Sequence, residues 1–238
     1  MNDLNLPKNR LLAALPQSVY QRLLPHLQIV ELPQKQIIYL SGDNYQYAYF
    51  PLNTMISSVL ILENGATTEI GTIGNEGMIG LPLILDTLYT NSAAVVQVGG
   101  NSYRIAAQYL QQELNQQGAF KELLMRYTQA RIIQLGQTAA CNRHHLLKQR
   151  FARWLLTVRD SLRSNQFQLT HEFISQMLGV RRSGVTQIAG EFQKAGIIQY
   201  KRGFVEILDN QKLEAAACEC YQVIYQQFSR LLDIEMRS

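Results

Sequence analysis

Between residues 181 and 202 the chain carries a dense series of side chains that can hydrogen bond to nucleic acid. Arginine can make two hydrogen bonds to guanine and glutamine two to adenine, whereas serine and threonine can contact a base or a phosphate. Lysine and arginine also neutralise phosphate charge without reading the base sequence. The residues of these types are Arg181, Arg182, Ser183, Thr186, Gln187, Lys194, Lys201 and Arg202. They are candidates for a DNA-binding surface, with a solvated basic face as the alternative.

The charge of the 238-residue chain is unevenly distributed, although its formal total is only +4. Residues 1–117 contain five basic and eight acidic side chains, a net charge of −3. Residues 118–238 contain 17 basic and ten acidic side chains, a net charge of +7, and residues 143–202 alone have an excess of +8. This asymmetry favours a polyanion as the partner of the second half.

The elements expected around the basic side chains have the order helix, turn, helix and hairpin. Thr170 can cap a first helix with Glu172 in its first turn, and Gly179 then permits a sharp turn. The inner face of a second helix is predicted by apolar residues at i, i+3, i+4 and i+7, which are Val185, Ile188, Ala189 and Phe192. Residues 197–207 read as a β-hairpin with a basic tip. This order is typical of a winged helix-turn-helix, and a helix pair with a solvated outer face is the alternative.

The first half of the chain has a different periodicity. A short helical segment near residues 11–24 is interrupted by Pro16, and residues 29–105 then form short, strand-like runs. Residues 56–62 and 67–73 flank the turn Glu63-Asn64-Gly65, which predicts a β-hairpin. Short strands with glycine-rich turns predict a sandwich, a jelly roll or a barrel.

A long helix over residues 118–143 is predicted between the two halves. Its first apolar stripe is Phe120, Leu123, Tyr127 and Ala130, and its second is Ile132, Leu135 and Ala139. One stripe can pack on the β domain and the other on the same helix of a second copy, and a fully buried helix in a monomer is the alternative.

Two further helices are predicted. Residues 151–162 form an amphipathic helix, and residues 212–232 read as one added helix with a packing role.

The order of these parts resembles the Crp/Fnr family of bacterial transcription regulators. The resemblance rests on Gly74-Asn75-Glu76-Gly77-Met78-Ile79-Gly80, on Arg150-Phe151-Ala152-Arg153-Trp154-Leu155-Leu156 and on Leu178-Gly179-Val180-Arg181-Arg182-Ser183-Gly184-Val185-Thr186. It implies an α+β fold with a cyclic-nucleotide-binding-like β jelly roll as sensor domain (residues 1–117), a dimerisation helix (118–143), and a winged helix-turn-helix with an extra C-terminal helix (144–238).

The resemblance also implies a function. A homodimer would bind an inverted-repeat operator in double-stranded DNA, with Arg182, Ser183 and Gln187 as base contacts and RNA polymerase as a further partner. Arg181 stands where relatives have a capping serine or threonine, so either Ser183 caps the helix or the cap is weak. The alternative is a small-molecule sensor or binding protein with a degenerate DNA-binding half, which should have lost the basic charge that this chain retains.

The region that resembles a phosphate-binding cassette departs from its relatives. Met78 stands in place of a glutamate, and Asn91-Ser92 stands in place of an arginine-serine pair. A buried phosphate without that arginine lacks the charge-assisted contact that offsets its desolvation. Cyclic AMP is therefore not expected to bind, and the effector is unknown. The corresponding pocket region comprises Met78, Gly80, Asn91, Ser92 and Thr138.

No metal, cofactor or catalytic site is expected. Cys141, Cys218 and Cys220 have a spacing unlike a disulfide framework or known metal-binding runs, and His144 and His145 are expected at a hinge or a phosphate contact. The first half has a single histidine, His26, too few for a cupin metal site, and hydrolase or nucleotide-binding motifs are absent from the sequence. The protein is expected not to be an enzyme.

Without a long apolar run or a signal peptide, the protein is expected in the cytoplasm, with no membrane partner.

Overall fold

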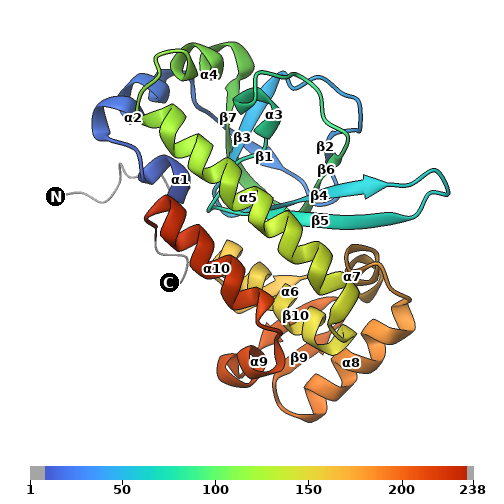
Figure 1. Cartoon of the computed structure of the whole chain (residues 1–238). Coiled ribbons are helices and arrows are strands. Elements are labelled where there is room, and N and C mark those ends of the chain that lie inside the picture. Colours follow the sequence, from blue (N-terminus) through green and yellow to red (C-terminus); the bar gives the residue numbers. More distant parts are fainter. Residues whose placement is uncertain (1–8, 235–238) are drawn as a thin grey trace.

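The computed structural model describes residues 9–234 and has the α+β fold expected from the sequence (Figure 1). In the first half, helices α1 (Arg10–Ala13), α2 (Gln17–Leu23) and the 3₁₀ turn η2 (Leu24–His26) precede strands β1 (Gln28–Leu32), β2 (Ile37–Tyr39), β3 (Tyr47–Pro51), β4 (Met55–Ile61) and β5 (Thr67–Ile73). Helix α3 (Leu81–Ile84), strands β6 (Ala93–Val98) and β7 (Gly100–Ala106) and helix α4 (Ala107–Leu114) complete this half.

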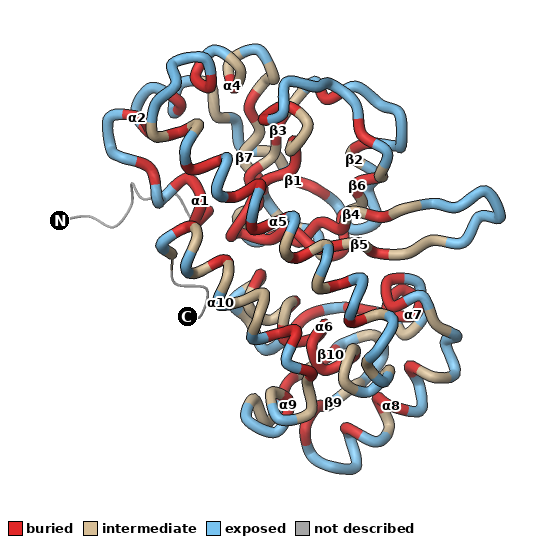
Figure 2. Tube along the Cα trace, in the orientation of Figure 1, coloured by how far each residue is buried: buried red, intermediate tan, exposed pale blue. Residues whose placement is uncertain are grey.

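Two antiparallel sheets form the β-roll. One has the order β1-β7-β3 and the other β2-β6-β4-β5. The predicted hairpin is confirmed as β4 and β5, which pair from Ile56 with Ile73 to Ile61 with Thr67. At its turn, Gly65 has a φ of 79° and the side chain of Asn64 accepts a hydrogen bond from the amide of Ala66. Figure 2 shows the tip of this hairpin as exposed.

The second half begins with the long helix α5 (Ala119–His144), which crosses the molecule from the β-roll to the helical part (Figure 1). It is followed by α6 (Leu147–Leu162), β8 (Gln166–Gln168), α7 (His171–Leu178), α8 (Arg182–Lys194), β9 (Ile198–Lys201) and β10 (Phe204–Ile207). Two further helices, α9 (Asn210–Ala216) and α10 (Cys220–Leu232), end the described chain. Within the described residues, no helix is both long and apolar enough to cross a membrane.

Two large apolar cores form in the molecule. The first core joins the β-roll to the buried stripe of α5, in which Phe120, Leu123, Tyr127 and Ala130 lie as predicted. The second core lies among α6, α7, α8 and a small antiparallel sheet of order β8-β10-β9, and its largest fully buried side chain is that of Trp154. Met55 and Val59 of β4 also belong to the second core. The helical part therefore packs directly against the β4–β5 side of the roll.

The single helix expected over residues 212–232 is wrong, because the structure has two helices there. The chain is extended at Ala217, between α9 and α10. Leu213 of α9 is buried in the second core, whereas Phe228 and Leu232 of α10 are buried in the first. One straight helix could not bury both sets, so tertiary packing overrides a local sequence that contains no proline or glycine.

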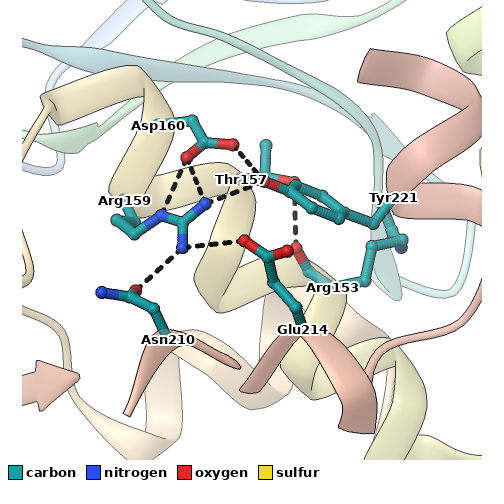
Figure 3. Close-up of polar contacts among 7 residues, drawn as sticks. All are labelled: Arg153, Thr157, Arg159, Asp160, Asn210, Glu214 and Tyr221. Atoms are coloured by element: carbon teal, nitrogen blue, oxygen red, sulfur yellow. Dashed lines mark hydrogen bonds and ion pairs between the residues drawn. The ribbon is translucent and has the colours of Figure 1, made fainter. Parts of the chain in front are cut away.

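A polar network fastens α9 and α10 to α6 (Figure 3). Arg159 donates from Nη1 to Asn210 Oδ1 at 2.8 Å, from Nη2 to the hydroxyl of Tyr221 at 2.8 Å, and from Nε to Asp160 Oδ1 at 2.8 Å. The Tyr221 hydroxyl in turn donates to Asp160 Oδ2 at 2.7 Å, and Glu214 pairs with Arg159 at 3.5 Å. These contacts hold α9 and the start of α10 against α6.

Candidate nucleic-acid interface

Helix α8 has the amphipathic character that its spacing predicted. Val185, Ala189 and Phe192 are fully buried in the second core, and Ile188 is 8% exposed. The preceding turn follows from two local features. Thr170 Oγ1 accepts from the amide of Phe173 at 3.2 Å as the predicted cap of α7, and Gly179 ends α7 with a φ of 62°. The buried face orients α8 so that its polar side chains point to solvent.

The start of α8 lacks a side-chain cap. Arg181 is its N-cap residue in an extended conformation, and within residues 9–234 no side-chain cap hydrogen bond forms there. Of the two possibilities left by the sequence, a weak cap is the correct one. The amide of Gly184 donates to the carbonyl of Arg181 at 3.0 Å, whereas those of Arg182 and Ser183 stay available to an anion such as phosphate.

All eight sequence-predicted contact residues are exposed. Arg182, Ser183, Thr186 and Gln187 lie on one face of the first turns of α8. Lys194 lies in the last turn, about 18 Å along the helix axis from Arg182. The structure therefore separates Lys194 from the other α8 candidates by most of the helix length.

The wing is a tight hairpin between β9 and β10. Lys201 pairs with Phe204, and the two residues between them, Arg202 and Gly203, have φ angles of 51° and 83°. Two consecutive positive φ angles define the turn type that matches strand twist, and glycine makes the second position unstrained. The turn brings Arg202 to a cleft of about 410 Å³ that Arg182 also lines. Arg182 of the helix and Arg202 of the wing, which are 20 residues apart in the sequence, thus lie on one surface.

His171 and Tyr200 belong to this surface although the sequence did not single them out. Their rings stack with centroids 4.0 Å apart, and His171 Nδ1 lies 3.0 Å from Thr186 Oγ1. Burial, followed by the nearby charge of Arg182, lowers the pKa of His171. The Thr186 hydroxyl also lies 3.1 Å from the carbonyl of Arg182, so it acts within the protein as well as facing outward. Both residues lie within the basic stretch of residues 143–202, but neither is a lysine or arginine, and neither belongs to the apolar spacing that predicted α8.

Gln187 is engaged within its own helix. Its Nε2 donates to Glu191 Oε1 at 3.2 Å, and Glu191 Oε2 in turn lies 3.5 Å from Lys148 Nζ on α6. These groups are exposed, so the interactions are weak ones. The amide of Gln187 can therefore leave Glu191 at little cost in free energy.

The predicted effector region forms a cavity of about 450 Å³ in the β-roll. Met78, Gly80, Asn91 and Ser92 line it, but Thr138 does not and is buried elsewhere along α5. Gly80 has a φ of 123°, and a Cβ there would lie 3.1 Å from that of Ala48, so both backbone and space require glycine.

Arg131 of α5 also lines this cavity, a position that sequence reasoning missed. It is 5% exposed, and its Nη1 donates to the carbonyl of Thr72 at 2.6 Å and also contacts Gln134 Oε1. The guanidinium is thus held by neutral protein acceptors at the cavity wall. The sequence offered little reason to expect Arg131 at the cavity, because an arginine within a long helix is usually exposed.

Comparison with known proteins agrees with this geometry. Residues 149–216 match the family model of the Crp-like helix-turn-helix domain. This part of the chain is a Crp-like helix-turn-helix domain. No curated protein sequence matches the chain. The matched residues contain most of α6 and all of α7, α8, the wing and α9.

Solved structures extend the likeness in fold beyond this Crp-like domain to the β-roll and the long helix. FixK2 from Bradyrhizobium japonicum superposes with a TM-score of 0.69 at 14% identity, covering 81% of this chain and 98% of that protein. A putative Crp/Fnr transcriptional regulator from Eubacterium rectale gives 0.62 at 19% identity, with 85% and 94% covered. A CooA mutant from Carboxydothermus hydrogenoformans gives 0.61 at 15% identity, with 90% and 96% covered. The β-roll, long helix and helix-turn-helix therefore form the fold of Crp/Fnr regulators.

Proposed function

We propose that the chain is a homodimeric transcription regulator of the Crp/Fnr type that binds an inverted-repeat operator in double-stranded DNA. The observation that carries this proposal is the placement of α8. Its inner face is buried, whereas Arg182, Ser183 and Gln187 are exposed beside a wing that presents Lys201 and Arg202. A helix of this kind fits the major groove, and the wing supplies phosphate contacts.

The exposed stripe of α5 supports the dimer. Met125 is 45% exposed and Ile132 is 62% exposed, and the heptad spacing continues to the exposed Ala139. A Cβ added to Gly136 would have no neighbour within 4 Å among the described residues, so a second helix could approach closely there. An apolar stripe repeating every seven residues is the seam of a two-helix coiled coil. A two-fold axis along this seam would pair the α5 helices and present two copies of α8 to half-sites about 34 Å apart.

The same proposal assigns a function to each domain of the chain. Residues 1–117 would act as sensor domain, 118–143 as dimerisation helix and 144–238 as DNA-binding domain. The cavity lined by Met78, Gly80, Asn91 and Ser92 is the candidate effector site. The protein would work in the bacterial cytoplasm with RNA polymerase as a further partner, and no enzymatic activity is proposed.

Fluorescence anisotropy tests the proposal. The full chain is titrated with a labelled duplex from the region upstream of its own gene and with a random duplex of equal length, at matched salt. We expect tighter binding to the upstream duplex and a stoichiometry of two chains per duplex. Equal affinities for both duplexes would refute sequence-specific recognition at that site, because phosphate contacts alone do not discriminate.

A further inference from the structure

All three cysteines of the chain lie close to one histidine, His145, at the connection between α5 and α6, which we call the hinge. Cys141 lies in the last turn of α5, and His145 follows the end of that helix. Cys218 and Cys220 lie where α9 gives way to α10. The four potential ligand atoms all lie within 4.8 Å of one another. Cys141 and Cys218, whose Sγ atoms are 3.5 Å apart, are 77 residues apart in the sequence.

The four atoms, all within 4.8 Å of one another, are gathered closely enough to surround a single ion. A zinc ion binds sulfur at about 2.3 Å and nitrogen at about 2.0–2.1 Å, so tetrahedral ligands lie about 3.8 Å apart for two sulfurs and about 3.6 Å for sulfur and nitrogen. The Sγ atoms of Cys141 and Cys218 are 3.5 Å apart, and Cys220 Sγ is 3.4 Å from His145 Nδ1. A cluster of several irons spreads its ligands over more than one metal and needs a wider arrangement.

The cysteines are buried apart from the apolar cores. Cys141 and Cys220 are 0% exposed and Cys218 is 4% exposed, and together they form a small cluster separate from both large cores. A buried cysteine that only fills space belongs among aliphatic and aromatic neighbours. Here each thiol instead has sulfur or polar neighbours, as a metal ligand does.

Outer contacts orient the histidine and one sulfur. His145 Nε2 lies 3.1 Å from Glu219 Oε1, which leaves Nδ1 directed at Cys220 Sγ. Gln137 Nε2 donates to the same sulfur at 3.1 Å. A carboxylate that holds the distal nitrogen of a histidine ligand is the usual support in zinc sites, since it fixes the ring and its tautomer.

We propose that Cys141, His145, Cys218 and Cys220 bind one Zn²⁺ ion as a structural Cys₃His site. The ion coordinates three thiolates and His145 Nδ1, and the thiol protons leave to solvent without any change of oxidation state. Four protein ligands close the coordination sphere, so no position remains for catalysis. The sequence-based expectation of no metal site is revised, because it lacked the fourth ligand that folding brings to the cysteines.

The site would fasten the start of α10 to the hinge end of α5. In Figure 1 the two helices run side by side in opposite directions, with the start of α10 beside the lower part of α5. The network around Arg159 already anchors α10 to α6 through Tyr221. A metal bound between α5 and α10 would lock α5, α6 and α10 into one arrangement at the hinge.

The first test measures metal in the full chain purified under reducing conditions without chelator. We expect one zinc per chain by mass spectrometry. Replacing zinc by Co²⁺ should give the visible bands of tetrahedral cobalt and a thiolate-to-metal charge-transfer band. Iron with inorganic sulfide, or a chain without metal whose Cys141 and Cys218 form a disulfide, would overturn the proposal.

Variants at neighbouring histidines provide a matched control. His145→Ala should lose the bound zinc, whereas His144→Ala should keep one zinc per chain because His144 lies outside the cluster. His145→Cys restores a fourth soft ligand and should recover zinc binding, which separates loss of a ligand from loss of folding. Glu219→Gln should weaken zinc affinity about 10- to 100-fold, measured by competition with a chromogenic chelator. Equal zinc content in the His144 and His145 variants would overturn the assignment.

Discussion

The indole Nε1 of Trp154 lies 3.2 Å from Glu69 Oε1, and this hydrogen bond joins α6 of the Crp-like domain to β5 of the β-roll. Both side chains are buried. Ser57 donates to Glu69 Oε2 at 2.7 Å, and Gln97 Nε2 contacts the same oxygen. Glu69 is therefore held by the sheet of the β-roll on one side and by the helix-turn-helix domain on the other. Burial is the main cause that raises its pKa, to about 7.

Stability should fall as the pH rises toward neutrality because of Glu69. Between its unfolded pKa near 4.5 and its folded pKa of about 7, the folded state binds a proton that the unfolded state has released. Raising the pH across this window should remove about 3 kcal/mol of unfolding free energy, with no further loss from this group above it. Urea denaturation from pH 5 to 8 measures the slope.

Two variants isolate this effect. Glu69→Gln removes the ionisable group and should flatten the slope. Glu63→Gln, at the exposed hairpin turn, should leave the slope unchanged. If the wild type and Glu69→Gln show the same pH dependence, Glu69 is not the source.

Helix and wing should differ in what they contribute to DNA binding. Gln187→Ala should relax base preference at one position in each half-site, which corresponds to about 1–3 kcal/mol of lost discrimination. Lys201→Ala should weaken binding to all duplexes alike and lower the salt slope by about one. Anisotropy titrations on single-base operator variants at several salt concentrations measure both effects. The assignment of roles fails if the two substitutions affect every sequence equally.

The exposed apolar stripe of α5 predicts a dimer that one added charge on this stripe can dissociate. Ile132→Glu would place two carboxylates near the two-fold axis, so it should shift the protein to monomers and reduce operator affinity by about tenfold or more. Light scattering coupled to size-exclusion chromatography measures the mass. Arg126→Glu also adds an acidic group to an exposed position of α5, but off the stripe, and should remain dimeric. Dimers that persist in Ile132→Glu would place the interface elsewhere.

Cyclic AMP should leave thermal stability unchanged. A ligand that binds only the folded state adds stability that grows with its concentration. The cavity presents the uncharged Asn91 and Ser92, and Arg131 is occupied by Thr72 and Gln134. Differential scanning fluorimetry with rising nucleotide concentration measures the midpoint. A midpoint that climbs with cyclic AMP would show that Met78 and Asn91 are no obstacle to the nucleotide.

Local features of the sequence determined much of the architecture. The cap at Thr170, the turn at Gly179 and the i, i+3, i+4, i+7 spacing of α8 depend on neighbours within one or two turns, so they can be read without a structure. The same holds for the β4–β5 hairpin. The exposed face of α8 follows directly, because burying one side of an amphipathic helix exposes the other.

Only the tertiary structure decided which distant groups meet. Arg131 lines the cavity of the β-roll, Glu69 contacts Trp154, and residues 212–232 form two helices instead of the expected single one. Cys141 and His145 are four residues apart at the end of α5, whereas Cys218 and Cys220 lie where α9 gives way to α10, so no linear motif unites the four. Such contacts depend on how whole elements pack, and packing is a property of the folded chain rather than of any short window within it.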